Sequence, residues 1–256
     1  MFIDIKLDHG VAVVTIDNPT KKNALATPMR DALLQAFLDF ADDDDVRAVV
    51  LTGAGDTFCS GADVNAMGRR DLAASRTGMK AMHALIRAMH GLEKPVIAAV
   101  RGSAVGMGWS LALACDLVIA SETSKFAQVF KRIGLAPDAG AVWFLARQIG
   151  FARAKELVYS ARTLPAQEAM HLGLVHRIVP DGDLLEQTMN LAREYAAGPT
   201  LALGMAKLMF AACVSPSLDQ FLAMEVLVQP QLTLSQDHAE GIAAFKEKRK
   251  PVFTGR

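Results

Sequence analysis

The sequence has little cysteine, few large aromatic residues and no excess of either charge. Its 256 residues include 3 cysteines, 2 tryptophans and 2 tyrosines, and 27 basic residues balance 27 acidic ones. A small, odd number of widely spaced cysteines argues against a disulfide framework. A formal net charge of zero provides no overall field to attract nucleic acid or an anionic membrane. We therefore expect reduced thiols and no nucleic-acid or membrane partner.

Long apolar runs and a leader-like start are also missing. No run of about 18 apolar residues occurs, and the first residues lack a basic stretch followed by an apolar one. Hydrophobic residues nevertheless make up 52% of the chain. At this length they provide a sizeable core, either for one large domain or for a domain with an appendage. These features predict a soluble, cytoplasmic globular protein.

Short apolar runs separated by turns predict the strands of the first half. Residues 2–7 and 11–16 predict a β-hairpin, and 48–52, 96–100 and 117–120 predict further strands. A helix is expected to follow residue 61 as far as about residue 91, with an irregular, lid-like part over 68–78. The order strand, strand, helix, without the Gly-x-Gly-x-x-Gly fingerprint, favours a right-handed spiral of ββα turns over a dinucleotide-binding sheet.

The second half has an almost entirely helical pattern. We divide the chain into a core over 1–197 and a C-terminal helical region over 198–256. The many apolar residues of 218–234 predict contact with another subunit. One strand is expected over 175–179, and helices are expected over 141–150, 152–159, 165–172, 181–197, 199–212, 217–234 and 236–248.

Two glycine-containing loops, Gly61-Ala62-Asp63 and Gly106-Met107-Gly108, each follow a strand pattern and precede a helical one. A helix N-terminus presents unpaired N–H groups and the positive end of the helix dipole, so it binds anions. One such loop alone would be an ordinary turn. Two loops about 45 residues apart, behind strands expected to be neighbours, predict two backbone donors at one point. That geometry is typical of an oxyanion hole.

An ordered set of motifs spans essentially the whole chain. It comprises Asn18-Pro19, Asn23-Ala24-Leu25, residues 58–63, 95–100, 106–116 and 247–253. The set resembles the crotonase superfamily, also called the enoyl-CoA hydratase/isomerase family. The resemblance implies an α/β fold, a crotonase-type ββα spiral core with a helical C-terminal oligomerisation region, and a homotrimer or a hexamer built as a dimer of trimers. It also implies an acyl-CoA substrate, with coenzyme A as part of that substrate, no other cofactor and no metal.

The same resemblance places the thioester oxygen between the backbone N–H groups of Ala62 and Met107. The family usually has glycine at the second position, and the backbone donor survives that change. Hydratases of the family use two glutamates, and the matching positions here are Ser110 and Phe130. A phenyl ring takes no proton, and a serine hydroxyl without a paired base is a poor general base. We therefore do not expect efficient hydration by the two-glutamate route.

The remaining acid is Asp138. Taken alone, an aspartate before a helical pattern is an N-cap. Enoyl-CoA isomerases, and the ring-opening isomerase of phenylacetate breakdown, carry their proton-transferring acid at this position. The chain resembles the latter group in residues 129–138 and 143–145 and departs from it at 141–142. The resemblance thus implies an isomerase with Asp138 as the catalytic acid/base, its pKa raised if Phe130 and Leu135 line the site.

Other activities stay open. A related dehalogenase attacks an aromatic ring with a carboxylate here, assisted by a tryptophan and a histidine; His83 is at about the matching place, but Phe130 replaces the tryptophan. A hydratase-type lyase is a further alternative, as is a non-catalytic acyl-CoA or RNA-binding homologue, and the balanced charge weighs against RNA. The basic cluster over 246–250 is either a solvated helix end or a coenzyme A phosphate site of a neighbouring subunit. The residues expected to contact substrate or coenzyme A are Lys22, Ala24, Gly61, Asp63, Gly106, Phe130 and Lys250.

Overall fold

The computed structural model describes residues 2–63, 71–213 and 216–256. Its main sheet has six strands in the order β1-β2-β3-β4-β6-β9. β1 and β2 form the expected antiparallel hairpin around His9 and Gly10, both at positive φ, and the later pairs are parallel. The strands are β1 Ile3–Asp8, β2 Val11–Ile16, β3 Ala48–Gly53, β4 Val96–Val100, β6 Leu117–Ser121 and β9 Arg177–Val179.

A second, smaller sheet runs beside the first. It contains β5 (Ser103–Val105), β7 (Lys125–Ala127) and β8 (Leu164–Pro165), and a parallel bridge between Cys59 and Ala104 extends it. The sequence pattern predicted none of these strands, because two or three residues are too few to show a periodicity. Successive turns of the chain add one strand to each sheet, so the predicted ββα spiral is confirmed.

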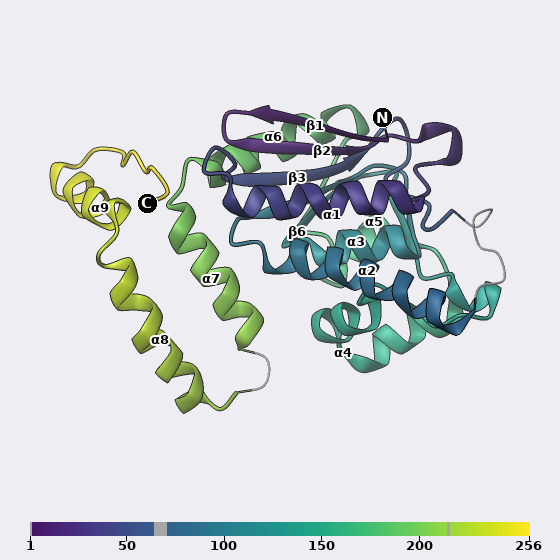
Figure 1. Cartoon of the computed structure of the whole chain (residues 1–256). Coiled ribbons are helices and arrows are strands. Elements are labelled where there is room, and N and C mark those ends of the chain that lie inside the picture. Colours follow the sequence, from purple (N-terminus) through teal and green to yellow (C-terminus); the bar gives the residue numbers. More distant parts are fainter. Residues whose placement is uncertain (1, 64–70, 214–215) are drawn as a thin grey trace.

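Helices cover both faces of the main sheet (Figure 1). α6 packs on one face, against a buried layer that includes Val50, Ile97 and Ala99. α1, α2 and α3 pack on the other face, and burial on both sides explains why the central strands are apolar throughout. No helix in the described ranges is long and apolar enough to cross a membrane. The helices are α1 Thr27–Asp42, α2 Leu72–Gly91, α3 Met107–Ala114, α4 Ala141–Ser160, α5 Ala166–His171 and α6 Leu184–Ala196, with 3₁₀ turns η1 Pro19–Lys21, η3 Phe130–Ile133 and η4 Asp181–Asp183.

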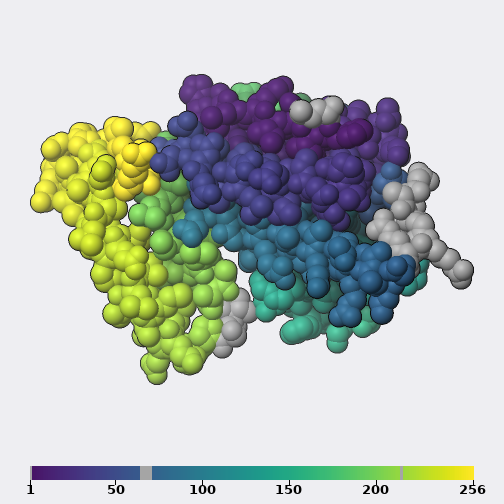
Figure 2. Space-filling model, in the orientation of Figure 1, coloured from purple at the N-terminus to yellow at the C-terminus, as the bar shows by residue number. Residues whose placement is uncertain are grey.

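The last three helices form an arm at one side of the molecule (Figure 1). They are α7 (Thr200–Ala212), α8 (Leu218–Leu232) and α9 (Gln236–Glu247). Figure 2 shows a hollow between the free end of this arm and the body. α8 contains no buried residue, and Leu218 and Val226 are each 70% exposed. The expected C-terminal helices are therefore present, whereas the boundary at 197 and the oligomerisation role stay predictions.

One predicted helix begins in the wrong place. We expected a helix directly after Gly61, but α2 begins at Leu72, where the Asp71 side chain accepts the Ala74 N–H at 2.7 Å. Ala62 instead forms a bridge with Leu25. Positions 72–78 of the expected lid are regular helix, and 68–70 lie outside the described residues. The expected interruption near Gly150 is confirmed, because that glycine has a non-helical φ of 78° inside α4.

Candidate active site

The small sheet aligns the two glycine-containing loops. Cys59 donates its N–H to Ser103 at 3.0 Å and accepts the Val105 N–H at 2.9 Å, which pairs Cys59 with Ala104. Three residues beyond each member of this pair lie Ala62 and Met107. A Cβ atom on Gly61 would be 3.7 Å from the Met107 nitrogen. The loops are therefore side by side, although they are far apart in the sequence.

Strand geometry sets the direction of the Ala62 N–H. Leu25 donates its N–H to Gly61 at 2.8 Å and accepts the Asp63 N–H at 3.1 Å. In a parallel pair these bonds engage the neighbours of Ala62, so its own N–H points away from Leu25. Met107 is the first residue of α3, where N–H groups have no intrahelical acceptor. Within the described ranges, neither of these two N–H groups donates a hydrogen bond.

Close backbone approach requires glycine in the second loop. A Cβ on Gly108 would be only 2.3 Å from the carbonyl oxygen of Cys59. Gly106 has φ 54° and ψ −121°, a conformation that side chains strongly disfavour. Met107 itself is 7% exposed and packs in the main core. Methionine at that position therefore leaves the backbone donor in place.

Asp138 lies between η3 and α4, and its side chain does not cap the helix. The N-cap of α4 is Gly140, and no side chain bonds to that end. The Oδ1 atom of Asp138 is buried and has no hydrogen-bond partner among the described residues. Burial raises the pKa of Asp138, and the electrostatic influence of His83 lowers it in part. A carboxylate of this kind is a stronger base than an ordinary aspartate.

Ser110 and Phe130 flank the second loop. Phe130 is 8% exposed, and its ring atoms would be 3.7 Å from a Cβ on Gly106. Ser110 is fully buried, and its hydroxyl lies 3.2 Å from the carbonyl oxygens of Gly106 and Asp138. Leu135 is 51% exposed. Phe130 rather than Leu135 therefore provides the buried apolar surface beside this loop.

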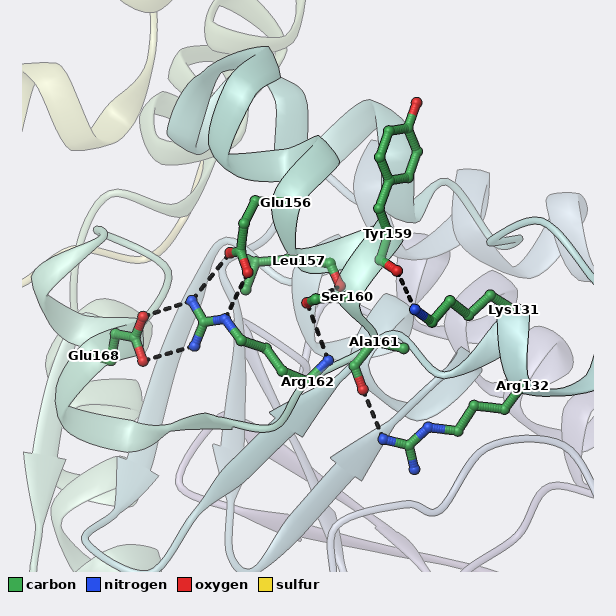
Figure 3. A network of polar contacts seen from close by, with 9 residues as sticks. All are labelled: Lys131, Arg132, Glu156, Leu157, Tyr159, Ser160, Ala161, Arg162 and Glu168. Atoms are coloured by element: carbon green, nitrogen blue, oxygen red, sulfur yellow. Dashed lines mark hydrogen bonds and ion pairs between the residues drawn. The ribbon is translucent and has the colours of Figure 1, made fainter.

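Polar contacts fix η3 to the end of α4 (Figure 3). The Arg132 guanidinium donates to the Ala161 carbonyl at 2.7 Å, and the Lys131 ammonium donates to the Tyr159 carbonyl. These cations satisfy carbonyl groups at a helix C-terminus, where the dipole favours positive charge. Arg162, just beyond, is held by ion pairs to two glutamates. They are Glu156 and Glu168, at 2.8 and 2.6 Å.

A model of one known family, enoyl-CoA hydratase/isomerase, matches residues 6–256. The chain belongs to this family. It is 41% identical over 254 residues to a Rhodobacter capsulatus protein named "Probable enoyl-CoA hydratase", covering 99% of this chain and 98% of the relative. It is also 36% identical over 259 residues to the 1,2-epoxyphenylacetyl-CoA isomerase of Escherichia coli, covering 100% and 99%.

Solved structures agree with this membership. The enoyl-CoA hydratase of Bacillus anthracis superimposes with a TM-score of 0.95 at 31% identity, and the match covers 100% of both chains. The protein is thus an enzyme of the enoyl-CoA hydratase/isomerase family with the crotonase fold. Relatives with hydratase names outnumber those named isomerase among the ones compared.

Some residues near the first loop that were expected to contact coenzyme A make hydrogen bonds or ion pairs within the protein. Lys22 is exposed, and its carbonyl accepts the Ser60 N–H at 3.0 Å, while Ala24 is 8% exposed. Lys21 rather than Lys22 pairs with Asp63, at 2.7 Å. The choice of Lys21 could not be predicted from the sequence, because two adjacent lysines precede the same turn.

The buried Asn23 holds this turn in place, a role that the sequence pattern did not reveal. Its amide donates to the Ala54 carbonyl at 2.8 Å and to the Thr57 carbonyl at 2.5 Å, and its oxygen accepts the Asn18 N–H at 2.9 Å. Both Lys22 and Asn23 have positive φ, at 51° and 55°. Asn tolerates this conformation better than most residues.

The C-terminal basic cluster lies far from the loops within one chain. Figure 1 places α9 at the opposite end of the molecule from the first turn of α2. Lys250 is exposed, and the neighbouring Arg249 is paired with Glu240 and Glu247, both at 2.6 Å. A contact between Lys250 and coenzyme A therefore requires the coenzyme of a neighbouring copy.

A cavity of about 1170 Å³ lies elsewhere, between α6, the turn before β3 and the C-terminal tail. Despite its volume, this cavity is a poor site for an anionic ligand, because cationic side chains that line it already donate hydrogen bonds to the protein. Arg47 donates to the Thr200 hydroxyl at 3.0 Å and to the Gly198 carbonyl at 2.7 Å, and Lys94 donates to the Asp43 carbonyl at 2.7 Å. The aligned loops near Asp138 fit the family's chemistry better.

Proposed function

We propose that this family member is an acyl-CoA isomerase in which Asp138 transfers the proton. The observation that carries the proposal is the buried Oδ1 of Asp138, which has no hydrogen-bond partner among the described residues. The carbonyl of the same residue lies within reach of the Ser110 hydroxyl, which also contacts Gly106. The acid is thus next to the loop that carries the Met107 N–H, and no glutamate stands at positions 110 or 130.

The reaction balances with one carboxyl group. The Asp138 carboxylate takes a proton from the carbon next to the thioester of a β,γ-enoyl-CoA, and the electron pair moves onto the thioester oxygen. The Ala62 and Met107 N–H groups stabilise this enolate, each contributing about 2.7–4 kcal/mol in comparable sites. The Asp138 carboxyl then returns the proton to the γ-carbon, and the double bond moves into conjugation with the thioester. Ring isomerisation would begin from the same enolate.

Binding follows the same arrangement. Gly61 and Gly106 give the thioester access to the backbone donors, Phe130 packs against the acyl group, and Lys22, Ala24 and Asp63 border the coenzyme A chain. Lys250 would reach the phosphates of a coenzyme bound to a neighbouring copy. The exposed apolar side chains of α8, such as Leu222 and Val226, support a homotrimer or a dimer of trimers. Coenzyme A enters as part of the substrate, and the proposed mechanism uses no further cofactor.

Hydration is the second candidate, because relatives named as hydratases are 33 to 41% identical to this chain. It would require a base for water where Ser110 and Phe130 now stand. Ultraviolet absorbance of the conjugated thioester separates the two reactions. Hydration of crotonyl-CoA removes the α,β-enoyl thioester and lowers the absorbance, whereas isomerisation of a β,γ-enoyl-CoA creates one and raises it. Dehalogenation ranks below both, although His83 does influence Asp138.

The variant Asp138→Asn tests the assignment. General acid–base groups contribute about 10²- to 10⁴-fold, so we expect turnover of a β,γ-enoyl-CoA to fall by that factor. Affinity for the acyl-CoA, measured by calorimetry, should stay within a few-fold, because both backbone donors remain. Asp45→Asn, in an exposed turn, is the matched control. Turnover by Asp138→Asn at the wild-type rate would show that another group moves the proton.

A further inference from the structure

We infer that Ser110 is a positioning residue that holds the proposed acid at a fixed place relative to the oxyanion donors. The inference rests on the proposed function of Asp138. Ser110 is fully buried in α3, and its hydroxyl oxygen is 3.2 Å from both the Gly106 and Asp138 carbonyl oxygens. The contact with Gly106, four residues earlier, is a common helical back-bond. The contact with Asp138 crosses 28 residues to another segment.

This contact is the main polar tie between the core and the segment that bears the acid. Within the described part of the chain, no other element donates a hydrogen bond to residues 136–140. The remaining bonds to this segment come from the helix that follows, through the Ala141 N–H to Asp138 and the Phe144 N–H to Gly140. The Ser110 hydroxyl in the first turn of α3 is therefore the polar contact that ties Asp138 to the core.

The segment needs such a tie because its backbone is strained. Ala139 has φ 50° and Gly140 has φ 78°. The left-handed region costs a non-glycine residue about 1–2 kcal/mol. Ala139 is fully buried, so its methyl group in the core and the Ser110 hydroxyl together oppose relaxation. Without the hydroxyl, the Asp138 carbonyl loses its link to α3, and the carboxyl group next to it gains freedom.

The role is positional rather than chemical. The Ser110 hydroxyl has one proton, which the Gly106 and Asp138 carbonyl oxygens share, and no titratable side chain in the described ranges bonds to it. It therefore has no base to activate it as a nucleophile. Met107, three residues before Ser110 in the same short helix, carries one oxyanion donor. One buried hydroxyl thus joins the turn that stabilises negative charge to the residue that removes the proton.

The test compares Ser110→Ala with Ser124→Ala. Ser124 is also buried and donates to a backbone carbonyl, that of Val100 at 2.7 Å, but it has no contact with Asp138. Two rates are measured: turnover of a β,γ-enoyl-CoA and deuterium uptake at the α-carbon of a saturated acyl-CoA in heavy water. Ser110→Ala should lower kcat and exchange about tenfold, the scale of one lost hydrogen bond. KM should change less than about twofold, because Ser110 is not among the residues proposed to bind the substrate and its loss acts on the proton-transfer step.

Two further variants make the result decisive. Ser110→Cys, nearly isosteric but a weaker donor, should have a kcat between those of wild type and Ser110→Ala. It also serves if Ser110→Ala does not fold. Equal kcat for Ser110→Ala, Ser124→Ala and wild type overturns the inference, as does an equal loss in both serine variants. If Asp138→Asn is active while Ser110→Ala is impaired, the proposed function fails instead.

Discussion

The substitution Gly108→Ala tests whether backbone register creates the oxyanion site. The φ angle at Gly108 suits any residue, so alanine adds only a methyl group. That Cβ would be 2.3 Å from the Cys59 carbonyl oxygen and 2.8 Å from the Cys59 carbonyl carbon. Both are backbone atoms, so no side-chain rotation relieves the clash. The first turn of α3 and the Cys59 strand must move apart by roughly 1 Å to reach van der Waals contact.

This movement acts on the pairing that aligns the two donors. Cys59 accepts the Val105 N–H at 2.9 Å, and that bond belongs to the bridge three residues before Ala62 and Met107. A displacement of about 1 Å costs on the order of 10²-fold in rate, close to the loss of one oxyanion donor. Overpacking should also lower the free energy of unfolding by about 1–3 kcal/mol. We therefore expect a folded protein with kcat reduced about 100-fold.

Stopped-flow turnover of a β,γ-enoyl-CoA gives kcat, and thermal unfolding gives the stability. Gly91→Ala is the control, because Gly91 ends α2 and a Cβ there would contact nothing within 4 Å. It should leave kcat unchanged. A folded Gly108→Ala protein with kcat within twofold of wild type would refute the argument that this close approach sets the donor geometry.

Three further outcomes follow from the burial of Asp138 and the packing of the arm. Because burial raises the pKa of Asp138 in the folded state, kcat should fall on acidification with a midpoint above the ordinary aspartate value. Because the pKa is raised on folding, the folded protein binds that proton more tightly than the unfolded chain does, and the ionised carboxylate destabilises the fold at neutral pH. Asp138→Asn should therefore raise Tm at neutral pH and have little effect on Tm below the ordinary aspartate pKa. An equal Tm change at both pH values would contradict this. Gly204→Ala places a Cβ 2.3 Å from the Glu93 carbonyl and should lower the free energy of unfolding by about 1–3 kcal/mol, measured by denaturant titration, and an unchanged midpoint would show that α7 yields freely.

The strands of the main sheet were predictable because buried strand positions have a recognisable hydrophobic pattern in the sequence. β3 and β4 are buried on both faces and appear as continuous apolar runs, and the alternation of β1 and β2 marks a hairpin. The long helices were predictable from their apolar spacing. The start of α2 was not, because Gly61 resembles a helix-initiating turn. The next residue, Ala62, instead forms a bridge with Leu25, a strand partner far away in the sequence.

In the candidate site, too, the features set by local sequence could be predicted, and those set by tertiary packing could not. Ala62 and Met107 could be proposed from local glycine patterns and the family resemblance. The contact between Ser110 and Asp138 could not, because it joins two segments whose separation is set by the packing of α3 against α4. The pairing of Lys21 rather than Lys22 with Asp63 depends on the positive φ angles of a short turn. Contacts of this kind follow from the tertiary structure and leave no periodicity.

The proposed oxyanion donors are backbone groups, whereas the proposed acid is a side chain, and this difference has a chemical consequence. The two N–H donors belong to the backbone, and their alignment comes from the bridge between Cys59 and Ala104, which has the same 45-residue separation as Ala62 and Met107. Side chains near the loops can therefore change without removing the donors, as the buried Met107 illustrates. The proposed proton-transferring group has no such protection, because Asp138 acts through a side chain and lies beside the strained residues Ala139 and Gly140. Substitutions at positions 110, 130 and 138 should accordingly alter the reaction while the fold and the enolate stabilisation persist.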